Sequence, residues 1–341
     1  MITEIASPSD ERLKQAKEII LSGGVVAFHT ETVYGLGANA FDDAAVQKIF
    51  ALKGRPANNP LIAHVHEEFD IRPLVDFIPD YAHALRKAFL PGPLTMVYPS
   101  TGKVSRFVSC GLNTLAIRIP ASKVAQAFLK AVDLPVAAPS ANRSKHVSPV
   151  TAGHVYDDFK GEIPLILDGG ASEGGIESTV LDCTGEYPVI LREGLVTREM
   201  IISVTGRCGV YEKKADETPK SPGMMYQHYA PKCPTAYFTF KERDKALELY
   251  RGEEKKGGKP YLLIDEDLSG EIANAGLNVL LLGKTGEEMA QKLYAQLRNA
   301  EECATLLICI EPTLRGGVMA GVMNRLTRAF GTQESLIEEG K

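Results

Sequence analysis

Two cations flank a glycine at Lys53-Gly54-Arg55, directly before Pro56. Proline disfavours a helical conformation in the residue before it, so we expect Arg55 to be extended and the two cations to project to one side of a helix end. Adjacent cations repel each other unless an anion lies between them, and a phosphate group would supply that anion. Alternatively, Lys53 and Arg55 only stabilise the carboxyl end of the helix, where cations interact favourably with the helix dipole.

Arg118 lies within an alternating stretch, Thr114–Ile119, in which Thr114 and Arg118 share one face of a predicted strand. Burying a guanidinium is costly without an anionic partner. That partner is either an Asp or Glu of the chain or a substrate carboxylate gripped by two hydrogen bonds. His64 ends another predicted strand, and it is either a packing residue or a ligand of the same site.

Further polar residues lie at the ends of predicted strands. Ser140 and Asn142 come directly after strand 136–138, Ser178 precedes strand 179–182, and Arg192 ends strand 189–192. Polar groups at the carboxyl ends of strands occupy the ligand-binding edge of an α/β sheet. A turn-forming role explains Ser140 and Asn142 equally well when they are taken alone.

Two nucleotide-binding patterns are incomplete. Gly283-Lys284-Thr285 matches the end of a P-loop, but Asn278 stands where that loop requires its first glycine. Thr285 and Glu288 instead predict a capping box at the start of a helix. The stretch 35–40 fits G-x-G-x-x-A, but the next helix begins only near residue 42 and no acid follows about 20 residues later. Neither a P-loop nor a dinucleotide site is predicted.

The elements that position these residues form two blocks. In the first block, residues 1–208, strands mixed with helices predict a mixed α/β sheet. Its strands are expected at 25–28, 61–65, 94–98, 114–119, 136–138, 163–167, 179–182 and 189–192, and its helices at about 9–22, 42–54, 79–89, 122–132, 151–158 and 197–204.

Residues 209–233 lack a hydrophobic period and contain charges, Pro and Gly, so they are predicted to be a linker. The second block, residues 234–341, again alternates strands and helices, which suits a small doubly wound domain. Its strands are expected at 234–240, 260–265, 277–282 and 305–310, and its helices at 241–252, 285–299 and near 317–330.

Composition limits the class of protein. Single cores stop growing at roughly 250–300 residues, so 341 residues favour two domains. The net charge of −5 argues against strong direct binding of nucleic acid. No apolar run approaches the roughly 20 residues that cross a bilayer, and no signal peptide is recognisable, so a cytoplasmic protein is expected. The six cysteines lack metal-ligand spacing, and we expect them to be reduced.

Five motifs, in this order, resemble those of the YrdC-like threonylcarbamoyl-AMP synthase family. They are Thr30–Gly37, Lys53–Arg55, Pro139–Asn142, Gly175–Thr179 and, in the predicted linker, Ser221–Pro231. Each motif alone is weak, but five in order are specific. The last one resembles the linker of the long form of the family. The resemblance therefore implies a YrdC-like twisted mixed sheet with helices, followed by a Rossmann-like C-terminal domain.

By this resemblance, the chain would join L-threonine, bicarbonate and ATP into threonylcarbamoyl-AMP and diphosphate. A downstream tRNA threonylcarbamoyl transferase would receive the product and modify the adenosine next to the anticodon in tRNAs that read codons beginning with A. Mg²⁺ is expected with ATP, held mostly by water and the nucleotide, so no protein metal site is implied.

The resemblance also implies roles for individual residues. Lys53 and Arg55 would be catalytic. ATP would be bound by Lys53, Arg55, Asn59, Thr114, Ser140, Asn142, Ser148 and Arg192, and L-threonine by Thr32, His64, Arg118 and Ser178. His29, Ala138 and Met225 depart from the family pattern, so no contact is carried over to them.

Tyr226, His228 and Tyr229 are unusual in a passive tether, which is normally polar. We expect Tyr226 or Tyr229 to reach the nucleotide as part of a lid; alternatively, these rings only hold the two domains together. Two other function classes stay open at this point. One is an RNA-binding module, which the acidic charge disfavours, and the other is a different ATP-using carbamoyl transferase.

Overall fold

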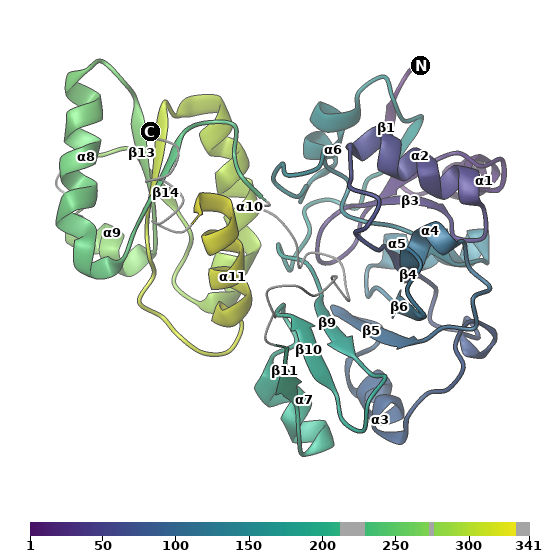
Figure 1. The fold of residues 1–341 in the computed structure, drawn as a ribbon. Helices are drawn as coiled ribbons and strands as arrows, with labels where there is room; N and C mark the ends of the chain where they lie inside the picture. Colours follow the sequence, from purple (N-terminus) through teal and green to yellow (C-terminus); the bar gives the residue numbers. More distant parts are fainter. Residues whose placement is uncertain (212–228, 273–275, 332–341) are drawn as a thin grey trace. The chain divides into compact units, whose positions relative to one another are not determined.

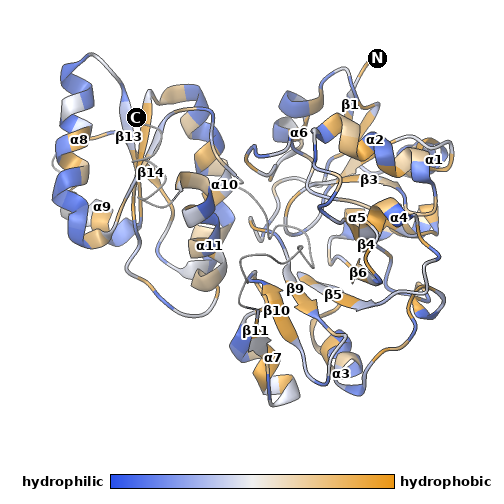
Figure 2. Ribbon diagram, viewed as in Figure 1, coloured by the Kyte–Doolittle hydropathy of each residue, from blue (hydrophilic) through white to orange (hydrophobic). Residues whose placement is uncertain are grey.

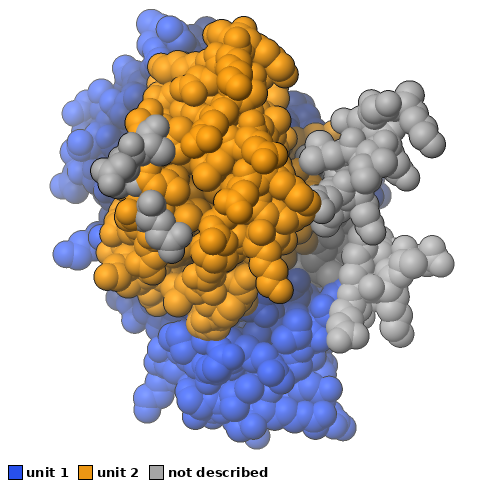
Figure 3. Space-filling model, turned by 90° about the vertical axis from the view of Figure 1, so that its left-hand side faces the viewer, with its two compact units in different colours: residues 1–144, 148–226 blue, residues 145–147, 227–341 orange. Residues whose placement is uncertain are grey.

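The computed structural model describes residues 1–211, 229–272 and 276–331, and the chain divides into two compact units. Unit 1 comprises residues 1–144 and 148–226, and unit 2 comprises residues 145–147 and 227–341 (Figure 3). All six cysteines are free, as predicted. In the described part of the chain, no helix is long and apolar enough to cross a membrane.

Unit 1 is built on one mixed sheet of 11 strands (Figure 1). Its strands are β1 (Glu4–Ala6), β2 (Val26–Phe28), β3 (Gly35–Asn39), β4 (Ile62–His64), β5 (Leu94–Pro99), β6 (Thr114–Arg118), β7 (Val136–Ala137), β8 (Leu165–Leu167), β9 (Thr179–Asp182), β10 (Val189–Arg192) and β11 (Gly209–Val210). They follow the order β1-β8-β2-β3-β7-β4-β6-β5-β9-β10-β11. Strands β4 and β6 run parallel, whereas β5 and β6 run antiparallel, which confirms the predicted mixed sheet.

The helices of unit 1 have recognisable caps. They are α1 (Asp10–Leu21), α2 (Asp43–Lys53), the 3₁₀ turn η1 (Arg72–Leu74), α3 (Asp80–Phe89), α4 (Arg106–Ser109), α5 (Lys123–Val132), α6 (Ala152–Phe159) and α7 (Arg198–Thr205). In α2, the Asp42 side chain accepts hydrogen bonds from the backbone of Ala44 and Ala45. Gly54 ends the helix with a φ of 60°, a conformation that glycine adopts without steric cost.

The sheet of unit 1 has apolar residues on both faces. Successive residues of a strand point to opposite faces, and Val25 and Ala27 accordingly belong to one buried cluster while Val26 and Phe28 belong to another. The second cluster also contains residues of α1 and α5, so these helices cover that face near β2. Figure 2 shows that β10 is mostly hydrophobic and that α8 is mostly hydrophilic.

Unit 2 is a four-stranded parallel sheet in the order β12-β15-β13-β14. The strands are β12 (Thr235–Phe238), β13 (Pro260–Ile264), β14 (Val279–Leu281) and β15 (Leu306–Ile310); the helices are η2 (Phe240–Glu242), α8 (Arg243–Lys255), α9 (Glu266–Ile272), α10 (Gly286–Cys303) and α11 (Met319–Phe330). Helices α8 and α9 lie on one face of the sheet and α10 and α11 on the other, as in a doubly wound domain (Figure 1). The Thr285 side chain caps α10 by accepting from the backbone of Glu288, which confirms the predicted cap.

Three residues from the middle of the first predicted block belong to unit 2. The carbonyl of Lys145 accepts a hydrogen bond from the backbone of Ala230. His146 lies 2.8 Å from Glu301, and Arg298 donates to the carbonyl of Val147 at 2.6 Å. The proposed boundaries at 208 and 234 stay predictions, but the chain segment 145–147 is embedded in the second unit.

Several short elements are absent from the sequence prediction. Strand β1 lies before the first predicted helix, and it pairs with β8. Strand β11 lies inside the predicted linker and pairs with β10. Helices α4 and α9 were also missed. With two to seven residues each, these elements are too short to show a hydrophobic period, and their partners are distant in sequence.

Candidate active site

Lys53 lies in the last turn of α2 with its ammonium group inside the protein. Only 3% of the residue is exposed, and Nζ donates to the carbonyls of Ser140, at 2.6 Å, and Asn142. Burial, followed by the charge of Arg55, holds the pKa of Lys53 well below its ordinary value. Lys53 therefore fixes the backbone of the segment that carries two of the predicted ATP ligands.

Arg55 and Asn59 form the next part of the site. Arg55 donates from Nε to the carbonyl of Asn59 at 3.0 Å and from Nη2 to that of Pro60 at 2.9 Å, which closes the loop between α2 and β4. The side chain of Asn59 is 1% exposed, yet neither polar atom of its amide has a hydrogen-bond partner among the described residues. Each unmade bond of this kind costs about 1–3 kcal/mol, and such groups are rare in folded proteins unless something else satisfies them.

The segment after β7 is fixed at a second point. Ser148 is fully buried, and its hydroxyl donates to the carboxylate of Glu177 at 2.7 Å. The backbone of Ser140 forms an isolated antiparallel β-bridge with Gly35 at the start of β3. The predicted ATP residues Ser140, Asn142 and Ser148 thus lie on one backbone segment, held by Lys53 at one end and by Glu177 at the other. Thr114, the remaining polar residue of this set, begins β6 and is partly exposed.

The predicted threonine residues come together around the end of β6. His64 on β4 and Thr95 on β5 both pair with Arg118, one on each side. The hydroxyl of Thr95 lies 2.8 Å from that of Ser178, and Arg192 donates to the Ser178 carbonyl at 2.9 Å. The structure therefore places these side chains along β4, β6, β5, β9 and β10, which are consecutive in the sheet, with Ser178 directly before β9.

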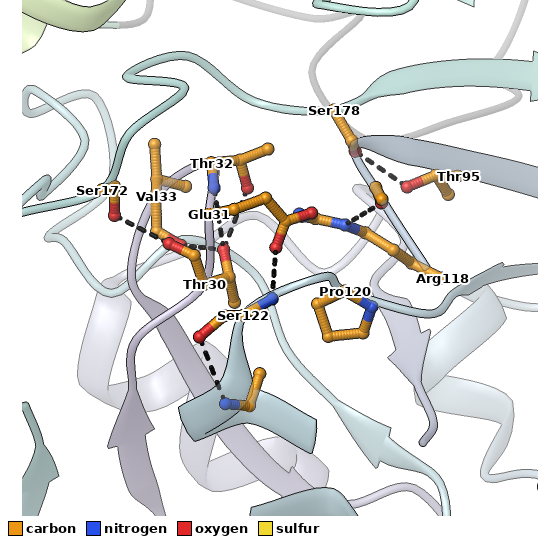
Figure 4. A network of polar contacts seen from close by, with 12 residues as sticks. Thr30, Glu31, Thr32, Val33, Thr95, Arg118, Pro120, Ser122, Ser172 and Ser178 are labelled. Atoms are coloured by element: carbon orange, nitrogen blue, oxygen red, sulfur yellow. Dashed lines mark hydrogen bonds and ion pairs between the residues drawn. The ribbon is translucent and has the colours of Figure 1, made fainter. Parts of the chain in front are cut away.

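Arg118 has an anionic partner within the chain. Its Nη2 donates to Oε1 of Glu31 at 2.6 Å, and only 4% of Arg118 is exposed (Figure 4). This is one of the two alternatives that the sequence left open. Glu31 was not identified as a site residue, although its position between Thr30 and Thr32, in a motif that ends at a strand, was a usable signal.

Thr32 lies on the same loop, with no exposed surface. Its hydroxyl is 2.9 Å from that of Thr30, and Thr30 donates in turn to the carbonyl of Val33 at 2.6 Å (Figure 4). These contacts hold the loop in a turn that aligns Glu31 with the end of β6.

His64 is neutral at neutral pH. Burial, followed by the charge of Arg118, lowers its pKa to about 3. Its Nδ1 lies 3.1 Å from the carbonyl of Ile62, and a carbonyl can only accept, so Nδ1 carries the proton. The other ring nitrogen, Nε2, is then a hydrogen-bond acceptor.

Five other positions were singled out in the sequence. Tyr226 and Met225 are outside the described residues. Tyr229 is 7% exposed and packs on Tyr294 of α10, with ring centroids 5.2 Å apart, so its ring forms part of unit 2. His29 accepts or donates a hydrogen bond with Ser122 at 2.7 Å, and burial lowers its pKa. Ala138 is buried in the core.

Comparisons with known proteins identify the family of this chain. Residues 18–194 match a family model described as Telomere recombination, and residues 196–331 match the model of the threonylcarbamoyl-AMP synthase C-terminal domain. The threonylcarbamoyl-AMP synthase of Pyrococcus abyssi is 41% identical over 327 residues, which cover 94% of each chain. That of Bacillus subtilis is 39% identical over 338 residues, which cover 97% of this chain and 96% of the relative.

Solved structures show the same similarity. A crystal structure of P. abyssi Sua5 complexed with L-threonine has a TM-score of 0.86 and 39% identity, and the match covers 97% of each chain. Both domains are therefore matched in one order and over nearly the whole length. This chain is an enzyme and belongs to the threonylcarbamoyl-AMP synthase family.

Proposed function

We propose that the enzyme forms threonylcarbamoyl-AMP and diphosphate from L-threonine, bicarbonate and ATP. The observation that carries this proposal is the group at the end of β6, where Arg118 and neutral His64 lie side by side. Ser178, directly before β9, and Arg192, on β10, lie farther along the same sheet, and Thr95 of β5 connects Ser178 to this group. A cationic group, an acceptor and a hydroxyl are what a free hydroxyamino acid requires, and the similar P. abyssi protein is complexed with L-threonine.

The reaction has two steps. The threonine ammonium loses a proton, and its nitrogen forms a bond to the carbon of CO₂ released from bicarbonate, which yields a carbamate, water and a proton. A carbamate oxygen then attacks the α-phosphorus of ATP, and the bond to the bridging oxygen of diphosphate breaks. Neither step requires a covalent bond to the protein. Catalysis therefore depends on positioning and on stabilising the charge that develops on the phosphoryl group.

The threonine subsite comprises Thr32, His64, Arg118 and Ser178. Arg118 binds the carboxylate, because its Nη1 has no hydrogen-bond partner among the described residues while Nε and Nη2 are engaged by the protein. Nε2 of His64 accepts a hydrogen bond from the substrate, since the protonated Nδ1 is directed to a backbone carbonyl.

The nucleotide subsite comprises Lys53, Arg55, Asn59, Thr114, Ser140, Asn142, Ser148 and Arg192. Asn59 supplies its buried amide, whose two polar atoms ATP would satisfy. Arg55 and Arg192 supply positive charge. Lys53 acts by holding the Ser140–Asn142 backbone, because its ammonium is already bound to two carbonyls. Tyr226 or Tyr229 would complete this subsite, although the Tyr229 ring is packed within unit 2.

Mg²⁺ is part of the proposal as a companion of ATP. The described residues contain no group of three or more His, Cys, Asp or Glu side chains that could hold a metal ion. Mg²⁺ usually keeps several waters and takes its other ligands from substrate phosphates, so it would arrive with the nucleotide. When bound, it would neutralise phosphate charge.

The product is a reactive mixed anhydride. We propose that a tRNA threonylcarbamoyl transferase in the cytoplasm receives it, so that this enzyme itself needs no strong contact with RNA. The net charge of −5 supports that division of tasks.

The test is product analysis. Diphosphate release should require L-threonine and bicarbonate together, and mass spectrometry should detect threonylcarbamoyl-AMP. Equal release with carbamoyl phosphate and no threonine would indicate a different carbamoyl transferase. Salt-dependent binding of RNA without diphosphate release would instead favour an RNA-binding module.

A further inference from the structure

The carboxylate of Glu31 joins three segments of unit 1 that are distant in sequence. Oε1 accepts from Arg118 at the end of β6, and Oε2 accepts from the backbone nitrogen of Ser122 at 3.3 Å. Ser122 is the cap of α5, and its hydroxyl accepts from the backbone of Ala125. Figure 4 shows Glu31 between Arg118 and Ser122, on the loop that also carries Thr32. The loop, the end of β6 and the start of α5 are thus connected through one side chain.

This carboxylate also determines which way the guanidinium faces. Nη2 of Arg118 is engaged by Glu31, and Nε donates to the carbonyl of Gly92 at 3.4 Å. An arginine has five N–H donors in a rigid plane, so fixing two of its nitrogens fixes the third. Among the described residues, Nη1 has no hydrogen-bond partner, so it is the part of Arg118 that a ligand can use.

We propose that Glu31 is a positioning residue for the amino-acid substrate, which holds Arg118 in the orientation that presents Nη1 to the threonine carboxylate. This inference rests on the proposed function, because it assigns Arg118 to that carboxylate. Glu31 also compensates the buried charge of Arg118 before substrate binds. The charges of Glu31 and Arg118 therefore cancel each other before substrate binds.

A second role for Glu31, as the base that deprotonates the threonine ammonium, is disfavoured. Burial opposes its ionisation, but Arg118 and the backbone N–H groups of Glu31 and Ala121 outweigh burial and hold its pKa below the ordinary value. An efficient base needs a pKa near the working pH. Glu31 thus acts through Arg118 and stays ionised throughout.

The test is a double-mutant cycle on Glu31→Gln and Arg118→Met, with diphosphate release measured against L-threonine and ATP. Glu31→Gln should raise KM for L-threonine roughly ten- to hundredfold, as expected for loss of a charged hydrogen bond. KM for ATP should stay within about twofold, because the nucleotide contacts are intact. Asp70→Asn removes an exposed pair with Arg72 in the same unit, so it serves as the control and should change neither value.

The double variant decides between mechanisms. If Glu31 acts through Arg118, the double variant is no worse than Arg118→Met alone, because the residue that Glu31 positions is already gone. It should also fold, since removing both members of a buried ion pair avoids an unpaired charge. A threonine KM that multiplies the two single effects would overturn the proposal, because Glu31 would then contact substrate independently.

The remaining outcomes are equally informative. If Glu31→Gln leaves KM for threonine unchanged in an active enzyme, this inference fails while the proposed function stands. If KM for ATP rises in parallel, Glu31 is only a structural residue and the inference also fails. If the wild-type protein releases no diphosphate with threonine, the proposed function itself fails.

Discussion

Replacing Lys53 by methionine separates two roles that this lysine could have. If Lys53 only faced a phosphate at the end of α2, Lys53→Met would lose activity while the free energy of unfolding stayed the same. In the structure, however, the ammonium is buried and donates to the carbonyls of Ser140 and Asn142. Methionine keeps most of the aliphatic volume and removes both hydrogen bonds.

The size of the effect follows from these contacts. The buried carbonyl of Asn142 and the partly buried carbonyl of Ser140 lose a charged donor, and each group left unsatisfied costs about 1–3 kcal/mol. Removing the ammonium also relieves the desolvation that lowers its pKa, which offsets part of the loss. We expect the free energy of unfolding of unit 1 to fall by about 2–4 kcal/mol, and Tm by roughly 4–16 °C for a unit of this size.

Urea and thermal unfolding, followed together with diphosphate release, measure this prediction. Lys48→Met is the matched control, because Lys48 lies on the same helix, is exposed and donates to a single carbonyl, that of Gly23, at 2.7 Å. Lys48→Met should lower the free energy of unfolding by well under half as much as Lys53→Met. If Lys53→Met lost activity but kept the unfolding free energy of the wild type, Lys53 would not stabilise the Ser140–Asn142 backbone. A role in binding phosphate would then be favoured.

Two further predictions concern the binding site. The pKa of His64 is about 3 in the folded protein and 6.5 in the unfolded chain, so the unfolded chain binds an extra proton at pH values between these two. The free energy of unfolding is therefore at its full value above pH 6.5 and falls as the pH drops below it. Between pH 7 and pH 5, the free energy of unfolding of His64→Gln, measured by urea titration, should therefore decrease by about 2 kcal/mol less than that of the wild type. Equal decreases in the two proteins would contradict this. Asn59→Leu removes two unsatisfied polar atoms, so unfolding experiments should show unchanged or higher stability while KM for ATP rises. An unchanged KM for ATP would exclude Asn59 from the nucleotide subsite.

Local features were predictable because their causes are local. Asp42 and Gly54 delimit α2, Thr285 caps α10, and the alternation of Thr114–Ile119 forms β6. In each case the residues that decide the conformation lie within a few positions of one another, so sequence spacing is sufficient.

Long-range contacts were not predictable from spacing. Lys53 meets Asn142 across 89 residues, and Arg118 meets Glu31 across 87. Both contacts depend on the strand order β2-β3-β7-β4-β6, which pairs elements that are not consecutive in the chain. A single sequence states which side chains need a partner, but the sheet order determines which partner each one finds.

Arg118 illustrates why the two alternatives for its partner are compatible. Without an anionic partner in the protein, the buried guanidinium of Arg118 would be uncompensated in every unliganded molecule. This would cost several kcal/mol. Glu31 removes that cost and engages Nη2, while Nη1 has no hydrogen-bond partner among the described residues and can bind a carboxylate. A resident anion and a substrate anion can therefore share one arginine, and the resident one makes the site ready before substrate arrives.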